Sequence, residues 1–296
     1  MKWEYLRAEE FDNAIHKSGG LCVMTLGCLE KHGQHLPVGT DSLMGDKIVE
    51  FASERAEVTM FPTTMWLGDV SLSHTFENAA ENNKCGFIGI NPKTLLIILE
   101  ELCDEIARNG FTKILFINAH NENADLLSIF CRAQFYKKKH YATMWASAYD
   151  FTKQLAPGNM YEAALSDPEY FSMLTKDDLN TLKSWSDIGA NEKYMDFIET
   201  TLAYGIYPKL VAADKYDAIE SQNTQKITFP NELGISTCAY RTNNHPDVQC
   251  ENHLPGCTKT IGDAAVKLSV DRLVKMFEYL KNDNSSVDVM EEFCLM

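Results

Sequence analysis

Residues 26–41 read LGCLEKHGQHLPVGTD and hold four side chains that are common metal ligands, Glu30, His32, His35 and Asp41. The segment follows directly on LCVMTL, an apolar run that predicts a short buried strand. Polar side chains at this density are a poor way to build a hydrophobic core. They indicate a site just beyond the carboxyl end of a strand, which is where α/β proteins usually bind ligands.

A second apolar run further along the chain has the same layout. KILFIN, residues 113–118, predicts another buried strand, and His120 and Glu122 follow it closely. In each block the acid and the histidine are two residues apart, and in an extended segment that spacing points both side chains to one side. We therefore expect both pairs at the same edge of one sheet.

Together the two blocks offer five ligands, namely Glu30, His32, Asp41, His120 and Glu122. Two imidazoles and three carboxylates suit Zn, Mn or Fe better than Ca or Mg. The set is too large for one structural zinc and fits two ions about 4 Å apart that share a carboxylate. Taken singly, Asp41 could be a helix N-cap and Glu122 an acid at a helix start. Two separate acid and histidine pairs favour the metal site.

Helical and strand-like patterns alternate along the chain with short connections. Amphipathic helices are predicted over residues 42–57, 92–109 and 261–281. Extended segments are predicted over residues 21–26, 58–67, 113–118 and 141–149. This alternation predicts an α/β fold with a mostly parallel core sheet flanked by helices.

The bulk composition is that of a soluble globular protein. Of 296 residues, 45% are hydrophobic and 23% are charged, and the net charge of −15 disfavours nucleic acid and anionic membranes as partners. The start lacks the apolar core of a signal peptide, and no run of about eighteen apolar residues occurs. Nine cysteines without a CxxC motif indicate reduced thiols and a cytoplasmic location. We expect one domain over 1–281, with a variable lid or insertion at 150–200 and a flexible tail at 282–296.

Three blocks of the chain resemble the creatininase (creatinine amidohydrolase) family. Residues 26–41 are similar to its signature, E-x-H-G-x-H-L-P-x-G-T-D, and residues 91–123 to its helix, strand and N-G-H-x-x-N motif, with Ala119 in place of the usual Gly. Residues 262–281 resemble its C-terminal helix. The likeness extends from about residue 20 to 280. It implies a creatininase-like layered α/β sandwich, which agrees with the alternation of helices and strands.

The resemblance also implies a centre of two divalent metal ions (Zn, Mn or Fe). Glu30 and His120 would hold one ion, His32 and Glu122 the other, and Asp41 would bridge them. The implied reaction is hydrolysis of a carbon–nitrogen (amide) bond in a small, cyclic substrate by a hydroxide that bridges the metals. The family also forms oligomers, often hexamers, so the resemblance implies a homo-oligomer.

One family motif is altered in this chain. The family usually carries H-A-G-x-x-E-T-S, whose histidine assists proton transfer, and the best match here is YMDFIETT, residues 194–201. Glu199 is retained, but Tyr194 takes the place of the histidine. A neutral phenol is a far weaker base than imidazole. Proton transfer is therefore assigned to Glu122, Tyr194, His35 and Glu199, with the alternative that His35 only orients a ligand carboxylate.

The replaced histidine leaves two other functions open. The same metal site could act on a carbon–carbon, ester or lactone bond, or catalyse an isomerisation. Alternatively, the chain could be an inactive family member that only binds a metal or a small molecule. The residues do not name the substrate, because the 150–200 region matches the family least, and they do not name the metal, because such ligands accept several ions.

Overall fold

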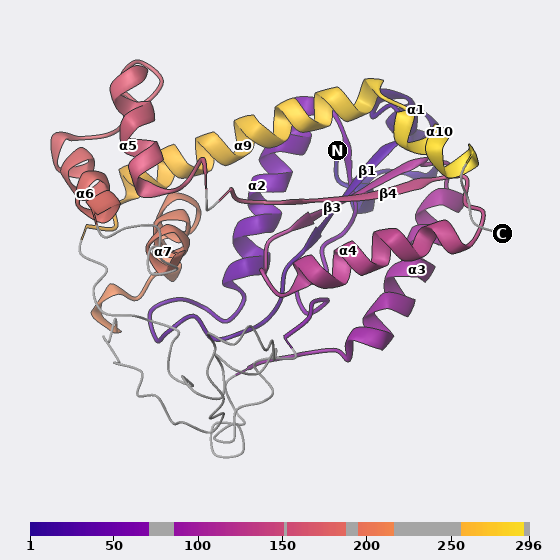
Figure 1. Cartoon of the computed structure of the whole chain (residues 1–296), viewed down its shortest axis with the longest axis horizontal. Helices are drawn as coiled ribbons and strands as arrows, with labels where there is room; N and C mark the ends of the chain where they lie inside the picture. Colours follow the sequence, from indigo (N-terminus) through magenta and orange to yellow (C-terminus); the bar gives the residue numbers. More distant parts are fainter. Residues whose placement is uncertain (71–85, 151–152, 188–194, 216–255, 293–296) are drawn as a thin grey trace, which may run out of the picture.

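A four-stranded parallel sheet forms the centre of the molecule (Figure 1). The computed structural model describes residues 1–70, 86–150, 153–187, 195–215 and 256–292. The strand order is β2-β1-β3-β4, and the strands are β1 (Leu21–Leu26), β2 (Thr59–Met60), β3 (Lys113–Asn118) and β4 (Ala142–Ser147). The predicted strands at 21–26 and 113–118 are confirmed residue for residue, whereas the extended segment predicted at 58–67 contributes only two residues to the sheet.

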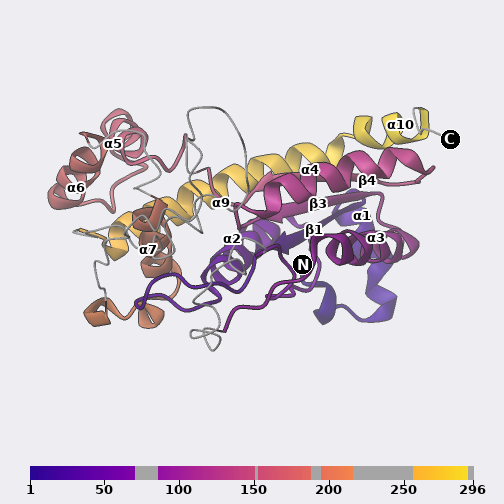
Figure 2. The same cartoon turned by 60° about the horizontal axis from the view of Figure 1, so that its bottom comes forward.

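Helices surround this sheet (Figure 2), and together they confirm the predicted α/β fold. The longer ones are α1 (Phe11–Lys17), α2 (Thr40–Ala56), α3 (Pro92–Arg108), α4 (Asn123–Ala133), α5 (Pro157–Ser166), α6 (Lys176–Asp187), α7 (Met195–Ile206), α9 (Lys259–Asn282) and α10 (Ser285–Glu292). Short 3-10 turns are η1 (Trp3–Tyr5), η2 (Ala8–Glu10), η5 (Gln134–Tyr136), η7 (Pro208–Leu210) and η8 (Ala213–Lys215). No helix among the described residues is long and apolar enough to cross a bilayer.

The sheet is covered on both faces, which is why most side chains of its two central strands are apolar. Side chains alternate along β1. Leu21 and Val23 pack into the cluster formed with α2, α7 and α9, whereas Met24 and Leu26 pack into the cluster formed with α3 and α4. Figure 1 shows α9 along one side of the sheet and α3 and α4 along the other. A strand buried on both faces positions the loop at its end rigidly.

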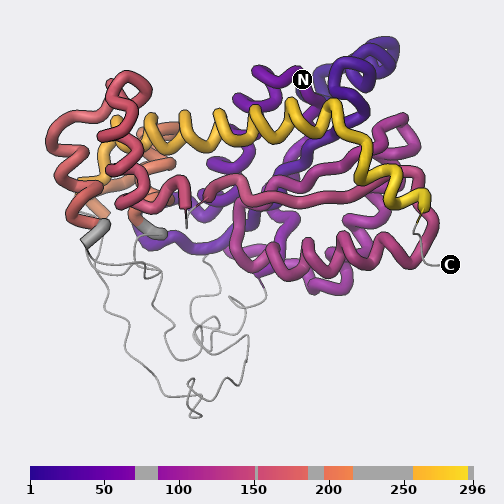
Figure 3. The backbone as a smooth tube through the Cα atoms, turned by 45° about the horizontal axis from the view of Figure 1, so that its top comes forward, coloured from indigo at the N-terminus to yellow at the C-terminus, as the bar shows by residue number. Residues whose placement is uncertain are grey.

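The helices of the 150–200 region gather at one end of α9 (Figure 3). Asp178 of α6 ties them to it: its carboxylate accepts hydrogen bonds from the hydroxyls of Thr258, at 2.6 Å, and Thr260, at 2.7 Å. These residues lie at the start of α9. The region predicted as a variable lid or insertion therefore includes α5, α6 and the first half of α7 within its described residues.

Two glycines allow α7 and α9 to cross closely. A Cβ built on Gly205 would lie 2.6 Å from the backbone of Gly262, and one built on Gly262 would lie 2.1 Å from the carbonyl oxygen of Thr201. Any larger side chain at the crossing would push the helices apart. Because Glu199 lies on α7, this crossing sets how close its carboxylate comes to the sheet.

Part of the predicted flexible tail is helical. Residues Ser285–Glu292 form α10, and Met290 on it is only 3% exposed. The turn before α10 is held by Lys113, a fully buried side chain at the start of β3. Its ammonium donates to the carbonyl oxygens of Leu280, at 2.7 Å, and Asp283, at 3.1 Å. The sequence of the tail is polar, so the anchoring contacts made by a distant lysine could not be inferred from it.

The α2 carboxylate of Asp46 offers a test of the local electrostatics. Burial raises its pKa to about 6, and Lys2 offsets only part of that effect. Because the carboxylate is harder to ionise in the folded chain than in the unfolded one, its charge costs stability once the pH exceeds the unfolded value of 3.8. Asp46→Asn should raise the free energy of unfolding by about 1 kcal/mol above pH 6, after allowance for solvent screening.

Urea unfolding at several pH values measures this effect. The gain should be absent below about pH 3, where the carboxyl is protonated in both states, should grow between the unfolded and folded pKa values, and should be complete above pH 6. Glu54→Gln is the matched control, because Glu54 is an exposed carboxylate on the same helix. An equal gain at all pH values would show that desolvation of the Asp46 charge is not its cause.

Candidate metal centre

The signature loop is folded back onto the start of α2. The amide of Glu30 donates to the carbonyl oxygen of Val38 at 2.9 Å, and the hydroxyl of Ser42 donates to the carbonyl oxygen of Cys28 at 3.0 Å. These bonds close the loop between β1 and α2. They bring the side chains just after the strand beside Asp41, which lies in the first turn of α2.

One asparagine shapes the second loop, and another ties that loop to the first. Leu26 and Asn118, the last residues of β1 and β3, are partners in the parallel register, so both strands end at one edge. The side chain of Asn118 accepts a hydrogen bond from the amide of His120 at 3.1 Å. Asn123 donates to the carbonyl oxygen of Gly27 at 3.2 Å and links the two loops directly.

The helix carrying Asp41 also approaches the second loop closely. A Cβ built on Gly45 would lie 2.5 Å from the Cβ of Ala119. Residue 45 must therefore be glycine if residue 119 carries a side chain and α2 is to keep this position. The alanine that departs from the family motif is accommodated in this way.

Asp41 is the centre of the resulting cluster. One of its oxygens, Oδ1, lies 3.1 Å from Nε2 of His32, and the other, Oδ2, lies 2.9 Å from Nδ1 of His120. Glu30 lies between the two histidines, with Oε1 at 3.4 Å from His120 Nδ1 and 3.8 Å from His32 Nε2. Asp41 and both histidines are at most 7% exposed. The two sequence blocks thus meet at one buried point.

Two further carboxylates flank the histidines. Glu199 of α7 lies 4.0 Å from Nε2 of His32, and Glu122 lies 3.9 Å from Nε2 of His120. The ligand atoms therefore fall into two groups that share Asp41, and within each group all ligand atoms lie within 4.8 Å of one another. One group contains Cys28, Glu30, Asp41 and His120, and the other contains His32, Asp41 and Glu199.

This grouping differs from the expected pairing in one respect. The resemblance assigned Glu122 to the side of His32, but the carboxylate that joins His32 in the structure is Glu199. Glu122 instead faces the outer ring nitrogen of His120. Glu199 was expected to take part in proton transfer, and the sequence could not place it at the cluster because α7 is far from the signature loop along the chain.

The chemistry of the cluster fits divalent metal ions. Nε2 of His120 and Oε2 of Glu122 are buried and make no hydrogen bond. Nδ1 of His32 lies 3.2 Å from the carbonyl oxygen of Glu30, so a neutral imidazole that donates there would leave the lone pair of Nε2 for a metal ion that Asp41 also binds. Such oriented nitrogen and carboxylate donors, with polar atoms left over, are typical of a metal site.

The electrostatics of the cluster point the same way. Burial disfavours the charged form of His32, but Asp41 and then Glu199 outweigh it and raise the pKa to about 10. Burial also raises the pKa of Glu30, whereas His32 and His120 hold the pKa of Asp41 well below its usual range. Glu30 and Asp41 likewise outweigh burial and raise the pKa of His120, so without metal the carboxylates favour the protonated form of both His32 and His120. A metal ion would displace those protons and take over the neutralisation of the carboxylates.

The remaining candidate catalytic residues lie around this cluster or outside the described residues. Nε2 of His35 lies 2.9 Å from the hydroxyl of Thr200, next to Glu199, and its carbonyl oxygen accepts from the amide of Ala212 at 2.8 Å. Burial and the charge of His32 lower the pKa of His35 to about 4, so the ring is neutral near pH 7. His35 thus anchors α7 to the signature loop. Tyr194 lies outside the described residues.

Cys28 is a member of the cluster that was overlooked in the sequence. Its thiol donates a hydrogen bond to Oδ2 of Asp41 at 3.0 Å, and the side chain is fully buried. The cysteine count and the lack of a CxxC motif indicated only a reduced thiol at this position. The signal that could have identified it is its spacing, because Cys28 precedes Glu30 by two residues and so points to the same side of an extended segment.

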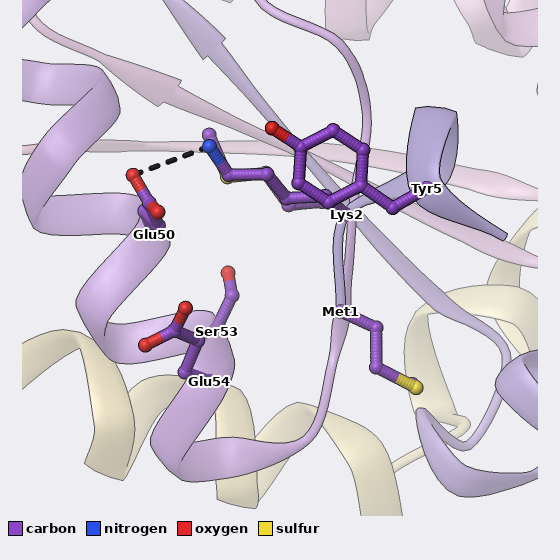
Figure 4. Close-up of a pocket in the computed structure, with 7 residues that line it drawn as sticks. Met1, Lys2, Tyr5, Glu50, Ser53 and Glu54 are labelled. Carbon is purple, nitrogen blue, oxygen red and sulfur yellow. Dashed lines mark ion pairs between the residues drawn. The ribbon is translucent and has the colours of Figure 1, made fainter.

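A separate hollow lies beside the N-terminus (Figure 4). Its lining includes Lys2, which forms an ion pair with Glu50 at 3.2 Å, together with Met1, Tyr5 and Ser53. Glu50 is about 14 Å further along α2 than Asp41, at 1.5 Å of rise per residue. This hollow contains no histidine or cysteine and has no described link to the cluster.

Comparison with known proteins places the chain in a family. A family model described as creatinine amidohydrolase matches residues 4–276. The creatinine amidohydrolase of Pseudomonas putida is 22% identical over 205 residues, which cover 67% of this chain and 69% of that protein.

Solved creatininases share the fold. A manganese form is 18% identical, with a TM-score of 0.66, and covers 95% of this chain and 99% of its own. A form described as Zn-Zn type is 17% identical, with a TM-score of 0.64, and covers 95% and 98%. A mutant complexed with creatine is 18% identical, with a TM-score of 0.62, and covers 95% and 99%. The chain therefore belongs to the creatininase family of metal-dependent amidohydrolases.

Proposed function

We propose that the chain is a binuclear metal-dependent hydrolase that opens an amide bond in a small cyclic substrate. The observation that carries the proposal is the pair of ligand groups that share Asp41. One ion would be held by Glu30, Asp41 and His120, and the other by His32, Asp41 and Glu199. This assignment replaces Glu122 by Glu199 as the carboxylate on the His32 side.

The charge of the site supports two divalent cations. The four carboxylates at the cluster outnumber its two histidines, so the centre is negative even when both rings carry protons. Such a concentration of buried negative charge is costly unless cations neutralise it. Two bound ions would supply a shared hydroxide near neutral pH and stabilise the negative charge that develops on a carbonyl oxygen.

Glu122 is the group best placed to handle the proton. Its Oε2 is buried and without a hydrogen bond, yet the side chain as a whole keeps 19% exposure. It therefore borders both the cluster and the accessible side of the site. We assign to it the transfer of a proton from the attacking water to the leaving nitrogen. His35 holds α7, and with it Glu199, in position through its bond to Thr200.

The proposed catalytic unit is a single domain that spans residues 1–281. Its 150–200 region would shape the substrate pocket. A homo-oligomer is expected from the family resemblance, and light scattering after gel filtration would determine its size. Small-molecule substrates follow from relatives named for creatinine and from the solved complex with creatine.

The function is tested by assaying ring opening with and without metal. Protein loaded with Zn or Mn should hydrolyse creatinine or another cyclic amide, and treatment with a chelator should abolish turnover. Readdition of the ion should restore it, because the site is preformed by protein hydrogen bonds. Lactones of matched ring size serve as the comparison class.

Each outcome separates the alternatives. Faster turnover of lactones than of cyclic amides would replace the proposed bond by an ester bond. Stoichiometric metal binding with no turnover of either class would favour an inactive, metal-binding family member. Turnover that survives complete removal of the metal would contradict the proposal.

A further inference from the structure

We propose that Cys28 supplies a sulfur donor to the ion held by Glu30, Asp41 and His120, and that this half of the centre selects a thiophilic ion such as Zn over Mn. The inference rests on the proposed binuclear function and deepens it. It makes the two halves of the centre chemically unequal, because the half formed by His32, Asp41 and Glu199 contains only nitrogen and oxygen donors.

The geometry places the sulfur among the ligands. Sγ of Cys28 lies 3.0 Å from Oδ2 of Asp41, and the same oxygen lies 2.9 Å from Nδ1 of His120. The ligand atoms of Cys28, Glu30, Asp41 and His120 all lie within 4.8 Å of one another. One cation could therefore contact a thiolate, an imidazole and two carboxylates after small side-chain rotations.

The histidine of this half is oriented toward the group. His120 is 93% buried, since only 7% of it is exposed, and its Nδ1 lies 2.9 Å from Asp41 Oδ2 and 3.4 Å from Glu30 Oε1, whereas its unpartnered Nε2 faces Glu122. Burial of a thiol alone would carry no such meaning. Cys22 on β1 is equally buried, but it packs in the apolar cluster with Met24 and belongs to no ligand group among the described residues.

The sulfur donor would make this half of the centre selective between metal ions. Thiolate is a soft ligand that favours Zn and similar ions, whereas Mn prefers carboxylates and water. The thiol proton would be released to solvent as the sulfur binds the ion. Four protein donors and the shared hydroxide would give the ion of this half a five-coordinate shell, whereas the three donors of the other half leave a further position for substrate.

Cobalt(II) provides a direct test on the intact protein. Chelator-treated protein should be titrated with Co(II) alone and its absorption recorded. We expect a strong near-ultraviolet band of sulfur-to-cobalt charge transfer that grows with the first equivalent. Cys28→Ser should lose this band while still binding cobalt. Cys22→Ala, which removes an equally buried thiol outside the cluster, should keep it.

Competition between ions provides a second readout. Wild-type protein should take up Zn in preference to Mn, and Cys28→Ser should shift that preference toward Mn by at least about tenfold, the scale on which metal-site substitutions act. If Cys28→Ser does not fold, the wild-type spectrum with the Cys22→Ala control still decides the question.

The outcomes distinguish this inference from the proposed function. Cobalt binding without a sulfur band, or an unchanged ratio of Zn to Mn in Cys28→Ser, would overturn the role of Cys28 and leave the binuclear centre intact. Failure of the protein to bind Co, Zn or Mn at all would overturn both.

Discussion

Asp41→Ala should abolish both metal binding and turnover. Asp41 is the only residue common to the two ligand groups found among the described residues, and each of its oxygens faces a different histidine. Removing it takes a donor from both ions at once. Metal ions contribute several kcal/mol of transition-state stabilisation, and a loss of about 4 kcal/mol corresponds to about a 10³-fold fall in kcat/KM.

The measurement is metal content by plasma mass spectrometry together with kcat/KM on the substrate that the wild-type protein turns over. Asp46→Asn is the matched control, since it removes a carboxylate from the same helix five residues later and should keep both ions and full activity. Asp41→Asn tests for collapse of the fold, because the amide retains the size of the carboxylate. Wild-type activity in Asp41→Ala would contradict a shared carboxylate.

The fold was predictable because its pattern is local. LCVMTL and KILFIN carry apolar side chains at successive positions, so both faces are apolar, as strands covered on both faces require, and they form β1 and β3. The ends of the helix predicted over residues 92–109 were marked by capping residues in the sequence. Asn91 caps it by accepting from the amide of Lys93, and Gly110 follows with a φ of 104°, which favours glycine.

The parts that the sequence did not reveal depend on contacts between distant segments. The turn before α10 is held by the ammonium of Lys113. The carbonyl groups that accept its hydrogen bonds lie more than 160 residues further along the chain. The close crossing of α7 and α9 needs Gly205 and Gly262 at one contact point. Both contacts join residues that are far apart in the sequence, so neither a local motif nor a periodic pattern predicts them.

The site divides in the same manner. Glu30, His32, Asp41 and His120 follow directly on predicted strands or begin a predicted helix, so their meeting at one sheet edge was foreseeable. The place of Glu199 was not, because it depends on how α7 packs. The family resemblance pairs His32 with Glu122, whereas the geometry pairs it with Glu199. An experiment can decide between these two carboxylates.

Glu199→Gln and Glu122→Gln should separate the two acids by their effects on metal content. Glu199 lies on the His32 side and belongs to a ligand group, so Glu199→Gln should cost the protein about one of its two ions. Glu122 faces His120 Nε2 from outside both groups, so Glu122→Gln should retain both ions.

Activity completes the distinction. As the group that transfers the proton, Glu122 should be worth about 10²- to 10⁴-fold in kcat, and Glu122→Gln should lose that factor with metal content unchanged. Glu199→Gln should lose activity together with its ion, and added metal should restore part of it. Metal analysis and kcat measured over a range of Zn concentrations give both readouts. Loss of an ion in Glu122→Gln but not in Glu199→Gln would return Glu122 to the His32 side and leave α7 as a wall of the pocket.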